Sequence, residues 1–158
     1  MTKLVFGCCE IKVKLLAEAL KYNSTLTELY FMSCNIKDSA VRFLGEVLKH
    51  NNSLTTLNLV NNQIGAKGAK SLGDALKNNN SLTTLNLKYN KIEDDGATAL
   101  GETLKYNNTL TSLKLTTSTG IKVFQAKGAK MLGKYHITDA GAMALGEALK
   151  LNSTLPSL

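Results

Sequence analysis

Cysteine and histidine are the side chains of this 158-residue sequence best suited to catalysis or metal binding, and there are five of them: Cys8, Cys9, Cys34, His50 and His136. The cysteines contain no C-x-x-C spacing, and the histidines stand at no metal-ligand spacing relative to them. No Ser, His and Asp set can be assembled, because His50 belongs to a helix-to-strand turn and His136 to an irregular stretch. We therefore predict no catalytic residue, no metal site and no enzyme activity.

Two other segments have the composition of a ligand site. The acidic triplet Glu93-Asp94-Asp95 has cation-binding side chains, but it opens a predicted helix, where carboxylates favour the positive end of the helix dipole. The segment Gly65-Ala-Lys-Gly-Ala-Lys-Ser71 has the Gly and Lys of a phosphate loop but lacks the G-K-[ST] ending. Its Gly and Lys positions recur at residues 126–130, as members of a repeat. The sequence thus predicts no cofactor and no small-molecule substrate.

The elements around these residues repeat with a period of 28. The string Asn-Ser-Leu-Thr-Thr-Leu-Asn-Leu at residues 52–59 recurs unchanged at 80–87. Each unit reads L-x-x-L-x-L-x-x-N/C-x-I and continues into a stretch with helical spacing, such as Ala69, Leu72 and Leu76. The apolar strand positions are Leu26, Leu29 and Phe31; Leu54, Leu57 and Leu59; Leu82, Leu85 and Leu87; and Leu110, Leu113 and Leu115.

This pattern resembles the leucine-rich repeat family, and the 28-residue unit with a full helix resembles its ribonuclease-inhibitor-like subclass, as in the C-terminal repeats of Nod-like receptors. The resemblance implies an α/β solenoid, a short arc of a horseshoe with a parallel β-sheet on the concave face and α-helices on the convex face. The residues agree independently, because an alternating L-x-L segment suits a short strand and the 3.6-residue period suits a helix. Neither element buries its apolar side alone, so stacked copies must supply the core.

We expect a single leucine-rich repeat domain over residues 1–158, with about five repeats near 4–25, 26–53, 54–81, 82–109 and 110–154, and the start of a truncated repeat at 155–158. The pattern breaks at 116–136, an irregular insertion that is either a functional loop or the scar of a deletion. Two arrangements fit the break. Either 116–136 bulges out and 140–151 is the fifth repeat's helix, or 126–134 fills the fifth helical slot and 140–151 is a sixth helix without a strand.

Several polar residue types recur at one position of successive repeats, which we call a column, and these columns have structural interpretations. The resemblance implies a ladder of side chains at the strand exits, formed by Cys9, Cys34, Asn62 and Asn90. A second asparagine column follows the helices, where a left-handed residue commonly ends a helix, and also explains the five N-x-[ST] matches: Asn23, Asn51, Asn79, Asn107 and Asn152. A glycine column lies mid-helix, where we expect close helix-to-sheet packing: Gly45, Gly73, Gly101 and Gly146. Lysines suit the negative ends of the helices: Lys21, Lys49, Lys77, Lys105 and Lys150.

The net charge and the cysteine content indicate which class of partner and which cellular compartment to expect. The formal net charge is +7, but it comes almost wholly from lysine, whereas nucleic-acid readers rely on clustered arginines, so nucleic acid is not favoured. No segment is long and apolar enough to span or target a membrane. An odd number of cysteines without a secretory signal indicates a reducing compartment, so we expect a cytoplasmic, intracellular protein.

The repeat pattern and the family resemblance together predict non-catalytic protein binding through the concave strand face. The candidate partner-binding residues are Glu28, Tyr30, Met32, Asn58, Asn86, Lys88, Tyr89 and Lys114. The competing interpretation is that these are ordinary solvated strand residues. Alternative functions are a GTPase-activating protein of the Ran-activator type, a sensor fragment of a Nod-like receptor, or a microbial effector. Neither end of the sequence carries a dedicated polar cap, which repeat arrays usually need for solubility. A further hypothesis is therefore a homo-oligomer that forms through the uncapped ends.

Overall fold

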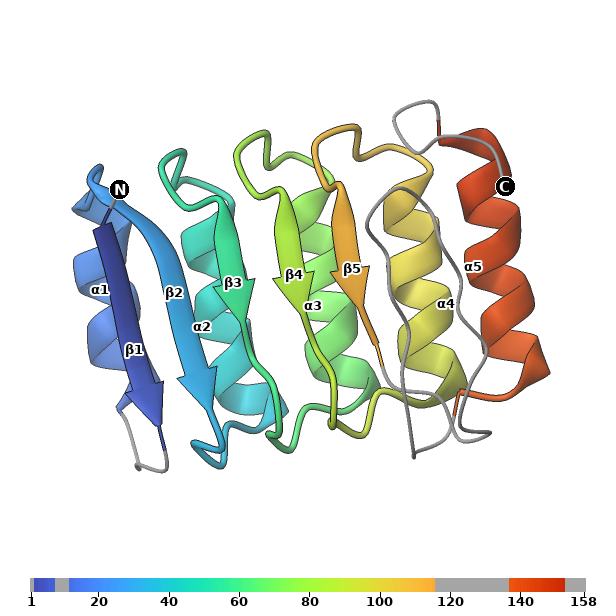
Figure 1. Ribbon diagram of the computed structural model, residues 1–158, viewed down its shortest axis with the longest axis horizontal. Coiled ribbons are helices and arrows are strands. Elements are labelled where there is room, and N and C mark those ends of the chain that lie inside the picture. The colour runs from blue at the N-terminus through green and yellow to red at the C-terminus, as the bar shows by residue number, and fades with distance from the viewer. Residues whose placement is uncertain (1, 8–11, 116–136, 153–158) are drawn as a thin grey trace.

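Strands and helices alternate along the chain in the computed structural model, which describes residues 2–7, 12–115 and 137–152 (Figure 1). The strands are β1 (Thr2–Gly7), β2 (Leu26–Met32), β3 (Thr56–Asn58), β4 (Thr84–Asn86) and β5 (Ser112–Lys114). The helices are α1 (Val13–Tyr22), α2 (Asp38–Leu48), α3 (Ala66–Leu76), α4 (Glu93–Leu104) and α5 (Asp139–Leu151). All five strands form one sheet in chain order, and every pair is parallel.

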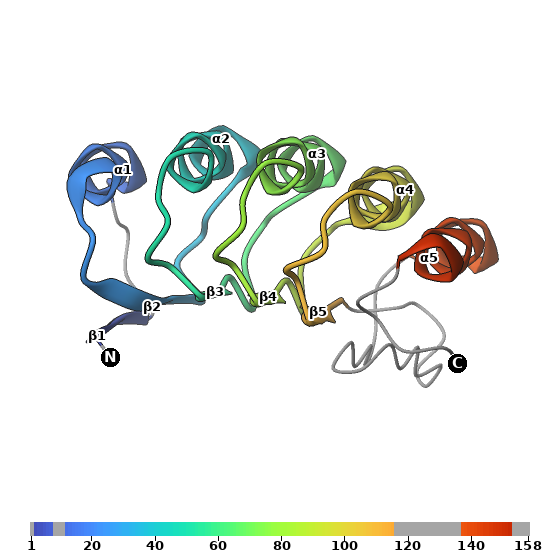
Figure 2. The same ribbon diagram turned by 90° about the horizontal axis from the view of Figure 1, so that it is seen from above.

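The helices all lie on one face of this sheet, and none of the described helices covers the other face (Figure 2). The sheet lines the inner side of a short arc and the helices its outer side, which confirms the predicted α/β solenoid. None of the described helices is long and apolar enough to cross a bilayer.

The strand register shows how the repeats stack. Leu57 lies opposite Leu85 across β3 and β4, as the 28-residue period predicts. Phe6 lies opposite Phe31 across β1 and β2, so the first repeat is three residues shorter than the others. The two rings stack with centroids 5.2 Å apart and planes 12° from parallel. The repeated leucines between sheet and helices are buried, and each contributes roughly 1.5–3 kcal/mol on transfer from water.

The asparagine at each strand exit bonds to backbone groups of two repeats. Asn62 donates from Nδ2 to the carbonyl oxygens of Phe31 (2.9 Å) and Leu59 (3.0 Å), and its Oδ1 accepts from the N–H of Cys34 and Ile36, each at 3.0 Å. Cys34 occupies the equivalent place in the preceding repeat. Its Sγ donates to the carbonyls of Met32 (3.5 Å) and of Phe6 in β1 (3.6 Å). Cys9 lies outside the described residues.

The second asparagine column is a second ladder, and the predicted left-handed helix ends are wrong. Asn23 and Asn152 have φ of −84° and −86°, and none of the other three has a positive φ. Asn79 is buried and donates from Nδ2 to Leu48 O (2.7 Å) and Asn51 O (3.2 Å) of the preceding repeat. Its Oδ1 accepts from the N–H groups at positions 81 (3.1 Å) and 82 (2.8 Å). The side chain therefore satisfies buried backbone groups at the helix-to-strand turn.

The glycine column also packs differently from the prediction, because the close approach is between neighbouring helices and not between helix and sheet. A Cβ on Gly73 would lie 2.6 Å from Thr103 Oγ1 of α4, and one on Gly101 would lie 3.0 Å from the carbonyl oxygen of Ala144 in α5. Gly146 in α5 has no described atom within 4 Å of a Cβ. The glycines thus let each helix of the outer layer approach the next one.

The last helix packs directly against α4. Asp94 of α4 accepts from the N–H of Thr138 (2.6 Å) and from its hydroxyl (2.5 Å), and thereby caps the start of α5. Thr138 in turn accepts at its Oγ1 from the N–H of Ala140 at 3.3 Å. This position of α5, next to α4, is the one expected if residues 140–151 form the helix of the fifth repeat. Residues 116–136 and 155–158 lie outside the described part of the chain.

Each lysine of the helix-end column pairs with a carboxylate three residues earlier, at N···O distances of 2.7–3.1 Å. The five pairs are Lys21–Glu18, Lys49–Glu46, Lys77–Asp74, Lys105–Glu102 and Lys150–Glu147. Exposed pairs of this kind stabilise a helix by only about 0.3–0.5 kcal/mol each. These pairs neutralise five of the 19 basic residues, whereas others on the outer layer, such as Lys67 and Lys70 of α3, belong to none of the five pairs.

Candidate functional site

The inner face of the sheet, which we call the concave face, brings together the predicted partner-binding residues. Tyr30, Asn58, Asn86 and Lys114 are register partners on β2, β3, β4 and β5 and form one row across the sheet. Glu28 and Met32 lie two residues to either side of Tyr30, and residues of a strand that are two apart share a face. Lys88 and Tyr89 follow the end of β4 after one intervening residue, Leu87. The strand spacing of about 4.8 Å makes the row roughly 14 Å long.

Tyr30 is the centre of a small polar cluster at the β1–β2 end of the concave face. Its hydroxyl donates to Glu28 Oε2 at 3.0 Å, and Lys3 Nζ lies 4.3 Å from the ring centroid. Partial burial, the hydrogen bond to Glu28 and the charge of that carboxylate raise the pKa of Tyr30. Glu28 is only 9% exposed, so it orients the tyrosine and is not freely available to a partner.

Lys3 and Val5 also lie on this face, and the sequence-based prediction missed both. They are the register partners of Glu28 and Tyr30. The signal was present in the 25-residue shift that aligns Leu4 with Leu29, because the same shift places Lys3 and Val5 at the positions of concave residues. Val5 is 47% exposed and lies beside Tyr30.

Asn58 and Asn86 hold the ends of the short strands. The Oδ1 of Asn58 accepts from the N–H of Val60 at 3.0 Å, and that of Asn86 accepts from the N–H of Lys88 at 3.1 Å. Asparagine side chains commonly bond the backbone two residues further on in this way. These amides therefore fix the path of the chain into the turns and position the residues that follow, Lys88 among them.

The turns after β2, β3 and β4 each place the residue at the same repeat position in the left-handed region, and the turn after β2 adds Asn35. Ser33, Asn61 and Tyr89 have φ of 58°, 54° and 57°. Asparagine tolerates this conformation, whereas for an aromatic side chain it costs roughly 1–2 kcal/mol. Tyr89 is nevertheless placed there and is 51% exposed. Strain of this kind at a half-exposed aromatic ring is typical of functional sites.

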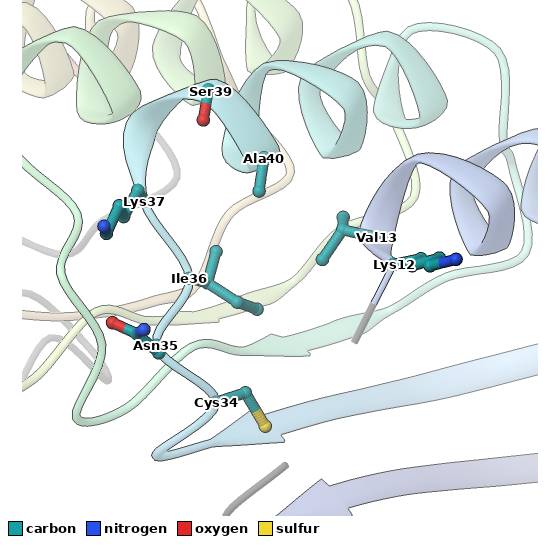
Figure 3. Close-up of a pocket in the computed structure, with 8 residues that line it drawn as sticks. All are labelled: Lys12, Val13, Cys34, Asn35, Ile36, Lys37, Ser39 and Ala40. Carbon is teal, nitrogen blue, oxygen red and sulfur yellow. The ribbon is translucent and has the colours of Figure 1, made fainter. Parts of the chain in front are cut away.

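The structure also contains a cavity of about 390 Å³ at the first turns of α1 and α2, away from the concave face (Figure 3). Its walls include Lys12, Lys37 and Ser39, and the sulfur of Cys34 points toward the strands, where it donates to backbone carbonyls. The described residues contain no group of three or more His, Cys, Asp or Glu side chains that could hold a metal ion. Among the lining residues that the structure describes, no side chains form a nucleophile–base pair.

Comparison with known proteins identifies the repeat. A family model described as leucine-rich repeat matches residues 22–45, 50–73 and 78–101, which begin 28 residues apart. The chain belongs to the leucine-rich repeat family. Each matched segment of this leucine-rich repeat protein covers a strand with its exit turn and the first part of the following helix. Comparison with curated proteins gives no match.

Two solved structures have a similar fold. One is described as "Leiomodin-1 Actin-Binding Site 2 (ABS2)"; it has a TM-score of 0.66 and 22% identity and covers 94% of this chain and 79% of its own. The other is a Caenorhabditis elegans tropomodulin C-terminal domain with a TM-score of 0.69 and 14% identity, covering 96% of this chain and 84% of its own. At these identities the likeness establishes the shared fold.

Proposed function

We propose that this leucine-rich repeat protein is a non-catalytic interaction module of the ribonuclease-inhibitor-like subclass and binds a protein partner through its concave face. The observation that carries the proposal is the row from Tyr30 to Lys114, which lies in register across the sheet on the face that no described helix covers. The outer face supports the same assignment, because its helix-end lysines are already paired with carboxylates.

The odd number of cysteines supports an intracellular setting for this module. The asparagines that match N-x-[ST] support it too. Four of the five are buried, and the amide nitrogens of Asn51, Asn79, Asn107 and Asn152 donate to backbone carbonyls, so the folded chain does not present them for glycosylation.

The test is a quantitative pull-down from cell lysate with the wild-type chain and two variants matched in composition. The concave variant is Tyr30→Ala/Lys88→Ala/Lys114→Ala, and the convex control is Lys67→Ala/Lys70→Ala/Tyr106→Ala, which changes exposed residues on or just after α3 and α4. We expect the concave variant to lose proteins that the wild type and the control both retain. If wild type and concave variant capture the same proteins in the same amounts, the concave-face assignment is wrong.

Actin is a second candidate partner, favoured by one observation, since the leiomodin-1 structure of similar fold is described as an actin-binding site. Co-sedimentation with filamentous actin tests it directly. Binding that survives in the convex control and falls in the concave variant would place actin on the proposed face. Absence of the chain from the actin pellet at micromolar concentrations would remove this candidate and leave the general proposal standing.

A further inference from the structure

The concave face is divided into two zones of different chemistry. The apolar zone consists of Val5, Met32, Val60 and the ring of Tyr30 at the β1–β3 end, next to the polar cluster that the Tyr30 hydroxyl and ring form with Glu28 and Lys3. Val5 and Tyr30 are register partners, and Met32 follows Tyr30 by two residues just as Val60 follows Asn58, the register partner of Tyr30. Val5 is 47% and Met32 37% exposed, so both present side-chain carbon to solvent.

The basic zone consists of Lys88, Tyr89 and Lys114 at the β4–β5 end. Lys114 is the register partner of Asn86, and Lys88 follows Asn86 by two residues. The two lysines are therefore diagonal neighbours about 7–8 Å apart at their backbones. None of the ion pairs found among the described residues involves Lys88 or Lys114.

No carboxylate of the described sheet neutralises this zone. Glu28 is the one acidic residue in the described strands, and it lies on β2, two strand spacings or about 10 Å from β4. It already accepts the hydrogen bond of Tyr30. At physiological ionic strength the screening length is about 8 Å, so Glu28 offsets little of the positive potential at Lys88 and Lys114.

Tyr89 adds an aromatic surface beside these two charges. The left-handed turn that carries it is occupied by Ser33 and Asn61 in the two preceding repeats, so the turn itself does not require an aromatic ring. Tyrosine supplies a large contact area with few rotatable bonds, which is why it is enriched at protein interfaces. A half-exposed tyrosine held in a strained turn next to two lysines therefore fits a contact with a protein segment.

We propose that the partner segment is acidic at one end and apolar at the other, and that it lies across the strands. The proposal rests on the assigned function, binding through the concave face. The apolar end packs on Val5, Tyr30 and Met32, and carboxylates pair with Lys88 and Lys114. From β2 to β5 is about 14 Å, which separates the two parts by four or five residues in an extended segment or by nine or ten in a helix.

A protein segment fits these zones better than a nucleic acid does. Phosphates would find Lys88 and Lys114 together in the basic zone and only Lys3 at the β1–β2 end, where Val5 and Met32 offer a phosphate chain no polar contact. Affinity for nucleic acid also depends on many simultaneous phosphate contacts, each of which releases counterions.

Selection from a random 16-residue peptide library displayed on phage, with the full chain immobilised, tests the proposal. We expect the enriched peptides to combine two or more Asp or Glu with a separate Leu, Ile, Phe or Met cluster. Fluorescence anisotropy then measures the leading peptide against variants. Lys88→Glu/Lys114→Glu should weaken it by about 10-fold or more, and Met32→Gln by roughly 3–5-fold. The matched control Lys67→Glu/Lys70→Glu changes the net charge equally on α3 and should stay within about 2-fold.

The outcomes separate this inference from the assigned function. Enriched peptides that lack acidic residues but still depend on Tyr30 and Met32 would overturn the two-zone inference and leave concave-face binding intact. Equal losses in the concave and α3 charge variants, or no enrichment over uncoated beads, would overturn the inference as well. A 20-nucleotide oligo(U) that binds the wild type more tightly than the leading peptide, with the same dependence on Lys88 and Lys114, would assign the basic zone to nucleic acid instead.

Discussion

The helix-to-helix role of the glycine column predicts opposite effects of the same substitution at two of its positions. In Gly73→Ala the new methyl group would lie 2.6 Å from Thr103 Oγ1 and 3.3 Å from the carbonyl oxygen of Ala99. Thr103 is 1% exposed, and its hydroxyl donates to that same carbonyl at 3.1 Å, so it has little room to yield. In Gly146→Ala the methyl group meets no described atom within 4 Å.

The magnitudes follow from three terms. Alanine favours a helix interior over glycine by about 1 kcal/mol, and this gain is common to both variants. Overpacking at position 73 costs about 1–3 kcal/mol, and a displaced Thr103 hydroxyl costs about 1 kcal/mol more. Gly146→Ala should therefore be more stable than wild type by up to about 1 kcal/mol, and Gly73→Ala less stable than Gly146→Ala by about 2–4 kcal/mol.

Urea unfolding followed by circular dichroism at 222 nm measures both variants, since the chain has no tryptophan to report by fluorescence. Thr103→Ala removes the atom nearest to the new methyl group, so the double variant Gly73→Ala/Thr103→Ala should be more stable than the sum of the two single changes predicts. Helix-to-sheet packing would instead make Gly146→Ala destabilising too. That result, or a Gly73→Ala variant as stable as Gly146→Ala, would refute the reasoning.

Three further predictions concern single side chains. Asn79→Ala should lower the free energy of unfolding by about 2–4 kcal/mol in urea, because buried backbone groups of two repeats lose their partners, whereas the exposed Asn80→Ala should change it by less than about 0.5 kcal/mol. Tyr89→Asn should raise the free energy of unfolding by roughly 0.5–1 kcal/mol, because asparagine tolerates the left-handed turn better than tyrosine does. It should also weaken binding of the peptide selected on the concave face. Stability equal to or lower than that of the wild type would contradict the claim that Tyr89 is strained. The hydroxyl and backbone hydrogen bonds of Thr138 lower the pKa of Asp94, so its carboxylate stabilises the fold above an unfolded-state value of about 3.9 and loses this contribution as the pH falls through the lowered pKa. Asp94→Asn should thus be less stable than wild type at pH 7, and thermal melts should show the gap closing below pH 4; a gap independent of pH would refute the cap.

The period of the sequence predicts the fold because it fixes which residues lie opposite each other. Leu57 and Leu85 recur after 28 residues and are register partners, so strand order and core follow from the repeat alone. The period says that Gly73 and Asn79 recur, but not which neighbour each one faces. That depends on how closely adjacent helices approach and on the direction of the amide in the turn, both of which are properties of the stacked structure.

The candidate surface was predictable where the repeat is regular. Tyr30, Asn58, Asn86 and Lys114 follow from strand alternation, whereas Lys3 belongs to the repeat that lacks three residues and was missed. The hydrogen bond that ties Glu28 to Tyr30 joins neighbours on one strand and depends on rotamers, which a repeat pattern does not encode. The left-handed conformation of Tyr89 could not be predicted from the sequence either, because tyrosine rarely adopts it.

The two asparagine ladders also allow the repeats to form in the order in which they are synthesised. The bonds that Asn62, Asn79 and Asn107 donate to the preceding repeat reach acceptors 28–31 residues upstream in the chain. On a ribosome, each new repeat therefore emerges to find its acceptors already synthesised. At roughly 5–20 residues per second, one repeat is added every few seconds, far slower than the closure of a short loop. The array can therefore grow one finished unit at a time from its N-terminal end, without waiting for the chain to be released.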